Sequence, residues 1–423
     1  MGSEVLSPSQ VACNLTASHI SSGRVEAMRT TAGYGLVQGP ASGITISDID
    51  GKSFIDCRSA GGVFNLGHRH PEVAHVLATA ARDTDMGDWM LLSAIRAQTA
   101  EKLARAAPGN LNHVQFAVTG GEAIEAACKL ARGATGRHDI VTMDKAYHGF
   151  VGFGLAAAPA SLTARYGPLT PGIVPVPYGD VDAVSRAIDG NTAAVLLETA
   201  QGSAGALLPP HGYLQALRSL CDERGVMLIF DEVQAGLGRT GKLFSFENWG
   251  VVPDMAVVGK ALGGGYYPIA ACLHNDRVLA FVNEVPLAHP STFSGSEIGC
   301  LVAAKALELL SAPALLDNVV TMGGRLNQGY QSLRREFPGF VTGSRQLGLF
   351  TGIETPSADT GTALRHAAVR HGLLAFTAPF RPGFLVIWPP LIITAAEVDE
   401  LLRRLARAVG EAAANSGRQS PRA

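Results

Sequence analysis

Lys260 is the residue whose setting in the sequence points most directly to chemistry. It follows the apolar run Met255–Val258, precedes the glycines Gly263–Gly265, and is one of only seven lysines among 423 residues. Burial lowers the pKa of an amine, and an uncharged lysine is a nucleophile toward carbonyl groups. The alternative is a lysine that extends its methylene stem toward the surface. The flanking strand pattern and the glycines favour the nucleophile.

Asp231 and the segment Thr119–Glu122 supply two further candidate groups. Asp231 ends the apolar run Val226–Phe230, where a carboxylate is costly unless a cation or hydrogen-bond donors face it. The segment 119–122 has the Thr and Glu spacing of a helix capping box, and Gly120 and Gly121 would let backbone amides approach an anion at the helix N-terminus. Taken alone, Asp231 could equally cap the next segment, and the turn could begin an ordinary helix.

Together these three groups match the needs of one cofactor, pyridoxal 5'-phosphate. Its aldehyde requires a lysine, its pyridinium nitrogen requires an acid, and its phosphate requires hydrogen-bond donors. We therefore predict that Lys260 holds the cofactor as a Schiff base and moves a proton between the substrate carbon and the cofactor. Asp231 would keep the ring nitrogen protonated, and the glycine turn would bind the phosphate.

The elements around these residues predict an α/β fold, because helical segments alternate with short apolar runs. Such alternation indicates βαβ units on a mostly parallel sheet, and ligands bind beyond the carboxyl ends of such strands. The predicted helices span 71–81, 93–107, 122–132, 181–188, 213–224, 298–310 and 395–414. The predicted strands span 113–118, 140–143, 193–198, 226–230, 255–258 and 269–272.

The ends of the chain differ from its centre. Asp50-Gly51 lies between two short alternating runs and predicts a hairpin over 44–56. The polar, aperiodic ends 1–23 and 415–423 are expected to be loosely held. We predict three segments: 1–65, which contributes the hairpin to a small domain; 66–310, a large cofactor-binding domain; and 311–423, the rest of the small α+β domain.

The overall composition restricts the class of partner. The formal net charge is −2, without the basic excess that a nucleic acid or an anionic membrane would require. Neither a transmembrane run nor a signal peptide is expected. The six cysteines lack C-x-x-C spacing, so we expect free thiols in a cytoplasmic protein and no metal site.

In order and spacing, the motifs resemble those of the class III aminotransferases of fold type I, typified by ornithine, acetylornithine, 4-aminobutyrate and ω-amino-acid aminotransferases. The resemblance extends from about Ile44 to Asp399. Its motifs are Gly67–Pro71, T-G-G-E-A at 119–123, Tyr147–Gly149, Glu198 with Gln201–Gly202, Asp231–Gln234 with Gly238–Gly241, Pro253–Asp254 before Lys260, Ser291–Phe293 and Pro389–Leu391.

The resemblance implies a homodimer with shared active sites that moves an amino group from an amine or amino acid to a keto acid or aldehyde. Besides Lys260 and Asp231, it implies that Glu198 orders the hydrogen bonds near the ring. The implied cofactor contacts are the amides of Gly120 and Gly121 on the phosphate, Tyr147 and Val233 on the two ring faces, His148, Gln234 on the phenolic oxygen, and Thr292 on the phosphate of the partner subunit.

Three positions depart from the family pattern. Gly121 stands where Ser or Thr usually donates to the phosphate, a loss of about 1 kcal/mol that Thr119 could replace. Val386 stands where many members carry an Arg for an α-carboxylate, and Ser203 where they carry its Glu partner. Either the Arg or the Glu alone would leave a costly unpaired charge in the pocket, so the loss of both together is physically reasonable. It weakens the case for a standard 2-oxoglutarate-using enzyme.

The substrate residues and the net reaction stay open at this point. Arg381 lies near the position where another branch of the family keeps a mobile carboxylate-binding Arg, and Tyr34 and Trp89 are pocket candidates by position. The alternative function is another reaction on the same scaffold: an aminomutase, a racemase or epimerase, a decarboxylase or a carbon–carbon bond-forming enzyme. A non-catalytic relic would tend to lose Lys260 or Asp231, and both are present.

Overall fold

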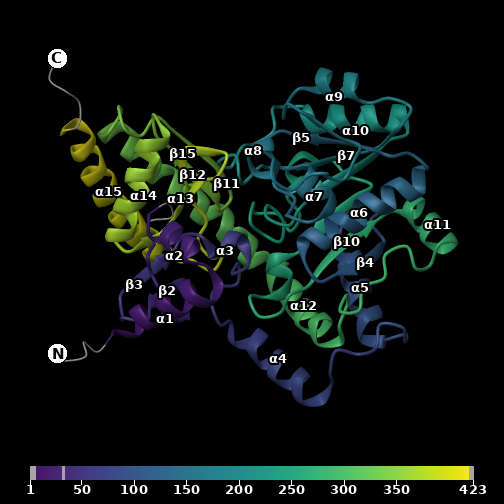
Figure 1. The fold of residues 1–423 in the computed structure, drawn as a ribbon, viewed down its shortest axis with the longest axis horizontal. Coiled ribbons are helices and arrows are strands. Elements are labelled where there is room, and N and C mark those ends of the chain that lie inside the picture. Colours follow the sequence, from purple (N-terminus) through teal and green to yellow (C-terminus); the bar gives the residue numbers. More distant parts are fainter. Residues whose placement is uncertain (1–5, 31–33, 419–423) are drawn as a thin grey trace.

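The computed structural model describes residues 6–30 and 34–418, arranged in two lobes (Figure 1). The lobe with the central part of the chain holds a seven-stranded sheet of order β4-β10-β9-β8-β7-β5-β6. The other lobe joins the N-terminal and C-terminal parts and holds two four-stranded sheets, β1-β2-β3-β13 and β11-β12-β15-β14.

The large sheet is mostly parallel, as predicted. Only β10 runs antiparallel to its neighbours β4 and β9, and the remaining pairs are parallel. The sequence did not predict β6, since its proline interrupts the strand pattern; at the sheet edge a missing amide donor is tolerated. The strands are β4 (His113–Ala117), β5 (Asp139–Met143), β6 (Ile173–Val176), β7 (Thr192–Glu198), β8 (Met227–Asp231), β9 (Met255–Val258) and β10 (Ala270–His274).

Both faces of this sheet are covered, because successive strand residues point to opposite sides. Ala194 and Leu196 of β7 pack with α6 (Gly120–Thr135), whereas Val195 and Leu197 belong to the larger cluster that includes α10 (Tyr213–Arg224). The other helices of this part are α4 (Pro71–Asp83), α5 (Ala94–Ala106), α7 (Gly152–Ala156), α8 (Ala160–Thr163), α9 (Val181–Ala187), α11 (Asp276–Glu284), α12 (Glu297–Leu310), and the 3-10 turns η2 (Ser245–Trp249) and η3 (Lys260–Gly263).

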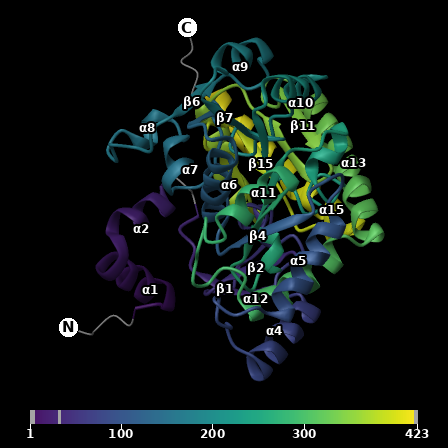
Figure 2. The ribbon, with the colours of Figure 1, turned by 90° about the vertical axis from the view of Figure 1, so that its right-hand side faces the viewer.

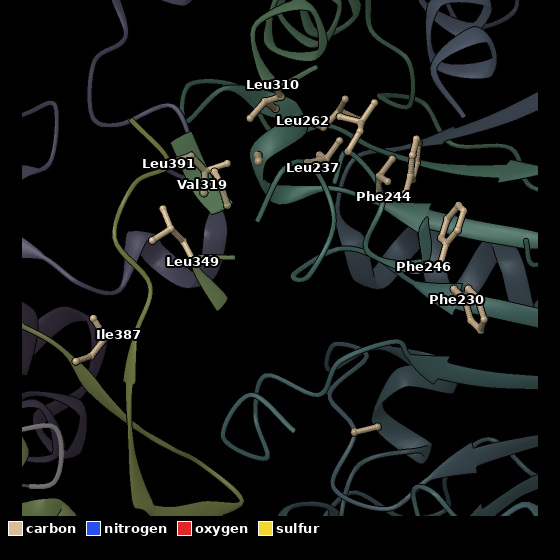
Figure 3. Packing of buried hydrophobic residues seen from close by; sticks show 14 of the residues in the cluster. Phe230, Leu237, Phe244, Phe246, Leu262, Leu310, Val319, Leu349, Ile387 and Leu391 are labelled. Carbon is tan, nitrogen blue, oxygen red and sulfur yellow. The ribbon is translucent and has the colours of Figure 1, made fainter. Parts of the chain in front are cut away.

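One hydrophobic cluster continues from the large lobe into the small one. Phe230 at the sheet joins Phe244 and Phe246 from the following loop, and Val319 and Leu391 belong to the same cluster (Figure 3). The two lobes therefore share a core.

The small lobe confirms the predicted N-terminal hairpin. β2 pairs antiparallel with β3, with Gly51 in the left-handed region at φ +93°, and β3 pairs in parallel with β13 from the distant C-terminal part. The elements are β1 (Gln38–Ser42), β2 (Thr45–Asp48), β3 (Ser53–Asp56), the short α3 (Ser59–Gly62), α13 (Pro313–Glu336), β11 (Gly343–Leu347), β12 (Phe350–Glu354), α14 (Ala358–Arg370), β13 (Leu373–Leu374), β14 (Phe376–Ala378), β15 (Arg381–Ile387) and α15 (Ala395–Arg418).

The N-terminal segment 1–23, expected to be aperiodic and loosely held, is helical over most of its described span. Helices α1 (Pro8–Thr16) and α2 (Ser22–Arg29) flank a π turn, η1 (Ala17–Ser21). Ser7 and Gln10 form a capping box at the start of α1, a local signal that a search for core periodicity misses because neither helix has a buried residue. Figure 2 shows both helices set to one side of the body. Residues 1–5 lie outside the described part.

At the C-terminus, α15 continues four residues into the segment expected to be loose, since it ends at Arg418 and 419–423 are not described. Within the described ranges, no individual helix combines the length and apolar character needed to cross a membrane. The bent pair α12 and α13, at 59°, meets those criteria jointly, by length and composition only.

Candidate active site

Three charged side chains converge at the carboxyl ends of adjacent parallel strands. Glu198 ends β7, Asp231 ends β8, and Lys260 lies two residues beyond β9. The sheet register pairs Glu198 with Asp231 and Asp231 with Val257. Because neighbouring parallel strands end at the same edge, residues far apart in the sequence meet here.

Asp231 is held by two hydrogen bonds. His148 Nδ1 lies 2.7 Å from Asp231 Oδ2, and the Val233 amide donates to Asp231 Oδ1 at 3.0 Å. Burial lowers the pKa of His148, but the hydrogen bond to Asp231 and its charge outweigh this and raise the pKa. His148 Nε2 is buried and has no partner among the described residues. A carboxylate has about four lone-pair sites, so Asp231 can still accept a further hydrogen bond.

Glu198 is a buried carboxyl group beside this pair. It accepts hydrogen bonds from the amides of Tyr147 at 3.0 Å and Gly202 at 3.3 Å. Burial raises the pKa of Glu198 to about 7, with Asp231 adding to the shift and His148 opposing it. Glu198 therefore exchanges a proton near neutral pH.

Lys260 is half-buried and opens on a cavity of about 330 Å³. Burial lowers the pKa of its amine, while Asp231 and Glu198 oppose this shift. Its backbone is left-handed, with φ +44°, a conformation that costs about 1–3 kcal/mol in a non-glycine residue and is concentrated at functional sites. A Cβ at Gly61 would lie 3.8 Å from Lys260 Nζ, so the backbone of Gly61 borders the amine.

The glycine turn begins α6 as predicted. Thr119 Oγ1 accepts the Glu122 amide at 3.2 Å, and Glu122 Oε2 accepts the Val118 amide at 2.8 Å. The amides of Gly120 and Gly121 have no acceptor within the described ranges. A Cβ at Gly120 would lie 2.9 Å from Val233 Cγ1, so a side chain would not fit. Two free donors at the N-terminus of a 16-residue helix suit a phosphate.

Gln234, Val233 and Tyr147 lie around this core. Gln234 Nε2 donates to the Gly61 carbonyl at 3.4 Å, next to Lys260. Val233 contacts the glycine turn, and Tyr147 is partly exposed with its ring 5.5 Å from that of Phe150.

Other predicted site residues lie elsewhere in the chain. Thr292 is exposed in the loop between α11 and α12. Arg381 forms an ion pair with Glu354 on the neighbouring strand. Trp89 lines a second cavity of about 310 Å³, and Tyr34 lines a cavity of about 490 Å³ in the small lobe.

The positions that depart from the family pattern are neutral in the folded chain. Val386 is fully buried in an apolar cluster with Phe350, Phe384 and Trp388. The Ser203 carbonyl accepts the Phe380 amide at 2.9 Å. Val386 therefore packs among apolar and aromatic side chains, and neither position carries a charge.

Sequence reasoning gave no role to two residues that shape the site. Trp388 stacks on Phe350 with ring centroids 4.7 Å apart, and its ring lies next to Gly202; its position two residues after Val386 was the available signal. Glu232, the neighbour of Asp231, is fully buried, and burial raises its pKa to about 8. It accepts hydrogen bonds from Thr199 Oγ1 and the Ser245 amide, which holds the loops beneath the site.

The family model for class III aminotransferases matches residues 32–409, and the chain belongs to that family. An uncharacterized aminotransferase of Archaeoglobus fulgidus is 44% identical over 377 residues, 89% of each chain. Among solved structures, the ornithine aminotransferase of Toxoplasma gondii described with partial occupancy of PLP at its active site has a TM-score of 0.85 and 26% identity over 98% of this chain and all of that one. An (S)-enantioselective ω-transaminase of Thermomicrobium roseum has a TM-score of 0.86 and 28% identity over 97% of this chain and all of that one.

The protein is therefore a fold type I, pyridoxal-phosphate-dependent aminotransferase. The described residues fit this cofactor. The free amides of Gly120 and Gly121 suit its phosphate, Asp231 retains lone pairs for its ring nitrogen, and the amine of Lys260 opens on a cavity. The confirmed reaction class is transamination; the alternative reactions considered from the sequence have no support in these comparisons.

Proposed function

We propose that Lys260 carries out the proton transfer in this transamination. The observation that carries the proposal is the convergence of its half-buried amine with Asp231 and Glu198 at the ends of β7, β8 and β9. When bound, pyridoxal phosphate supplies an electron sink for the substrate carbon. Burial favours the uncharged form of the Lys260 amine, which could take a proton from that carbon and pass it to the cofactor rather than back to the same carbon.

The other residues of the site would orient the bound cofactor and compensate charge around it. His148 holds one oxygen of Asp231 and leaves lone pairs of the carboxylate for the ring nitrogen. Glu198 fixes the amides of Tyr147 and Gly202 on two sides of the pocket. Gly120 and Gly121 would bind the phosphate, and Val233 and Tyr147 would cover the ring.

We propose that the amino donor is an amine, or an amino acid whose reacting amine is remote from its carboxylate. Val386 and Ser203 support this, because neither offers charge to an α-carboxylate and Val386 is fully buried. The acceptor would be a keto acid or an aldehyde.

We further propose a homodimer in which Thr292 reaches the phosphate in the partner subunit. Its neighbour Phe293 is 60% exposed, Leu287 in the same loop is 61% exposed, and Leu92 is fully exposed, as apolar residues that become covered in an interface would be. Light scattering measures the mass of the particle and tests this. All six cysteines are free thiols, which supports the expectation of a cytoplasmic protein.

The visible spectrum of the purified protein during addition of single amines and ω-amino acids, without an acceptor, tests the assigned roles. We expect the yellow cofactor band to bleach with the true donor class. Lys260→Ala should abolish bleaching, whereas Lys242→Ala, at an exposed lysine, should not. Full bleaching in Lys260→Ala would overturn the lysine assignment, and a band that shifts without ever bleaching would contradict transamination.

A further inference from the structure

The cavity of about 490 Å³ in the small lobe has a lining that the transamination site does not explain. It lies between α2, α14 and β14, and Arg58, Arg365, Tyr34 and Phe376 line it. The volume is that of a small-molecule site. Apart from its two arginines, its wall consists mainly of apolar and aromatic side chains with the hydroxyl groups of Tyr34 and two threonines.

Neither arginine has a counter-ion in the part of the chain that the structure describes. Arg58 stacks on Tyr34, with its guanidinium carbon 5.2 Å from the ring centroid, and its buried Nε has no partner in the described chain. Asp56 does not pair with the Arg58 guanidinium: its Oδ1 accepts the backbone amides of Arg58 and Ser59, and its Oδ2 pairs with His68 at 2.8 Å. Within residues 6–30 and 34–418, no carboxylate lies within ion-pair distance of Arg58 or Arg365.

Arg365 is the more buried of the two, with only 7% of the residue exposed. It donates to Thr377 Oγ1 at 3.0 Å and lies 3.2 Å from His366 Nε2, while its Nε is buried without a partner. Burial lowers the pKa of its guanidinium. A buried cation without a countercharge is costly, so this arginine is held at the expense of stability.

Two arginines elsewhere in the chain are compensated in different ways. Arg370, on the same helix as Arg365, pairs with Glu411 at 2.6 Å. Arg239 is buried without a carboxylate but donates to the carbonyls of Leu349 and Pro389 and to Asn65 Oδ1 at 2.6–3.2 Å. Arg58 and Arg365 have neither a carboxylate partner nor a full set of hydrogen-bond acceptors. This lack indicates that a ligand supplies the missing acceptors.

We propose that this cavity binds the carboxylate of an organic acid with an apolar body, held by Arg58 and Arg365. A guanidinium presents paired donors that match a carboxylate. Tyr34 is positioned by its hydroxyl, which donates to the Ala375 carbonyl at 2.5 Å, and its ring supports Arg58. Phe376 and the nearby prolines Pro379 and Pro382 would contact the apolar body.

The cavity adjoins the rear wall of the transamination pocket. Phe376 meets Trp388 edge to face with centroids 5.2 Å apart, and Trp388 Cη2 lies 2.8 Å from the position of a Cβ at Gly202. Arg58 also precedes Gly61, which borders Lys260, by three residues. The carboxylate could thus belong to the far end of an ω-amino acid substrate, which rests on the proposed function, or to a separate acid.

Calorimetric titration of the cofactor-loaded enzyme with hexanoate and with hexanol tests the binding itself. We expect hexanoate to bind and hexanol, which has the same apolar body without the charge, to bind at least 10-fold more weakly. Arg58→Gln and Arg365→Gln should each weaken hexanoate binding at least 10-fold, whereas Arg370→Gln should not. Equal hexanoate affinity in Arg58→Gln, or no binding by wild type at millimolar concentrations, would overturn the proposal. Because Arg58 is only half-buried, we expect Arg58→Gln to fold. This variant therefore still tests the proposal if Arg365→Gln does not fold.

Donor kinetics then identify the source of the carboxylate. If it is the substrate's own, Arg58→Gln raises KM for ω-aminohexanoate at least 10-fold, leaves kcat nearly unchanged, and leaves hexylamine unaffected. If a separate acid binds, the variant loses hexanoate affinity while both donors behave as in wild type. Absence of bleaching with every donor would contradict the proposed function alone, because the titration needs no turnover.

Discussion

Two regions of this molecule bury charged side chains, and they compensate that charge in opposite ways. At the ends of β7, β8 and β9, the acids Glu198 and Asp231 face the bases Lys260 and His148. In the small-lobe cavity, Arg58 and Arg365 face neutral groups. The first set is balanced before any ligand arrives. The positive charge of Arg58 and Arg365 is compensated only when an anion binds. This difference separates a catalytic centre, whose charges are already paired, from a site that recognises a ligand.

The segment between the two regions is strained. Ser59 and Ala60 have φ of +45° and +47°, followed by the left-handed Gly61 and Gly62. Each such non-glycine residue costs about 1–3 kcal/mol. The Ser59 hydroxyl donates to the Trp388 carbonyl at 2.7 Å, so the strained turn is tied to the aromatic wall that separates the two sites.

We expect the largest effect from removing one of the charged groups at the ends of β7, β8 and β9. Asp231→Asn keeps the shape but leaves His148 without its carboxylate partner. We expect kcat to fall about 100- to 1,000-fold, the usual effect of losing one well-placed electrostatic partner. The His148 pKa should also fall, measurable by NMR. Asp139→Asn, at the opposite end of the sheet, is the control. A near-normal kcat in Asp231→Asn would show that catalysis does not depend on the paired charges at this sheet edge.

Adding an uncompensated charge to the apolar wall should destabilise the fold. Val386→Arg buries a charge where Phe350 and Trp388 now pack, and we expect a loss of about 3–5 kcal/mol in the free energy of unfolding by urea titration. Val320→Arg, at an exposed position, should change little. Adding Ser203→Glu should restore part of the loss; no recovery would show that the two positions do not face each other.

The stability of the cofactor-free protein should fall between about pH 4.5 and 7 because of Glu198. Its pKa is raised to about 7 in the folded chain, so the folded state binds more protons than the unfolded state in this interval. The contribution of Glu198 to the unfolding free energy is therefore fully present below pH 4.5, and up to about 3 kcal/mol of it is lost above pH 7.

In Glu198→Gln this contribution to the pH dependence should disappear, as measured by urea titration at pH 5 and 8. Glu125→Gln, at a partly exposed glutamate on α6, should keep the wild-type slope. An unchanged slope in Glu198→Gln would mean that Glu198 is ionised throughout this interval.

We expect the smallest effect from adding a methyl group between the site at Lys260 and the small-lobe cavity. A Cβ at Gly202 would collide with Gln234 Oε1 and lie 2.8 Å from Trp388, so Gly202→Ala should cost about 1–3 kcal/mol of stability. Gly190→Ala, where nothing lies within 4 Å of the added atom, is the matched control. Equal melting temperatures for the two variants would show that the wall is not closely packed.

Sequence reasoning succeeded where the signal is local. The large parallel sheet, the hairpin at Gly51 and the helix that begins after Thr119 were all predicted, because strand runs, an Asp-Gly turn and a capping box each span fewer than about ten residues. It failed at α1 and α2, whose capping box lies outside any core pattern, and at β6, whose proline masks an edge strand.

By itself, the sequence determined the chemistry at the sheet edge: Lys260, Asp231 and the glycine turn each follow an apolar run, and parallel strands bring their ends together whatever the details of packing. Only the tertiary structure decided which charges stay unpaired. Arg58 and Arg365 are 307 positions apart, and nothing near either in the sequence shows that one cavity holds both without a carboxylate. Compensation of charge depends on every element packed around a group, and that arrangement exists only in the folded chain.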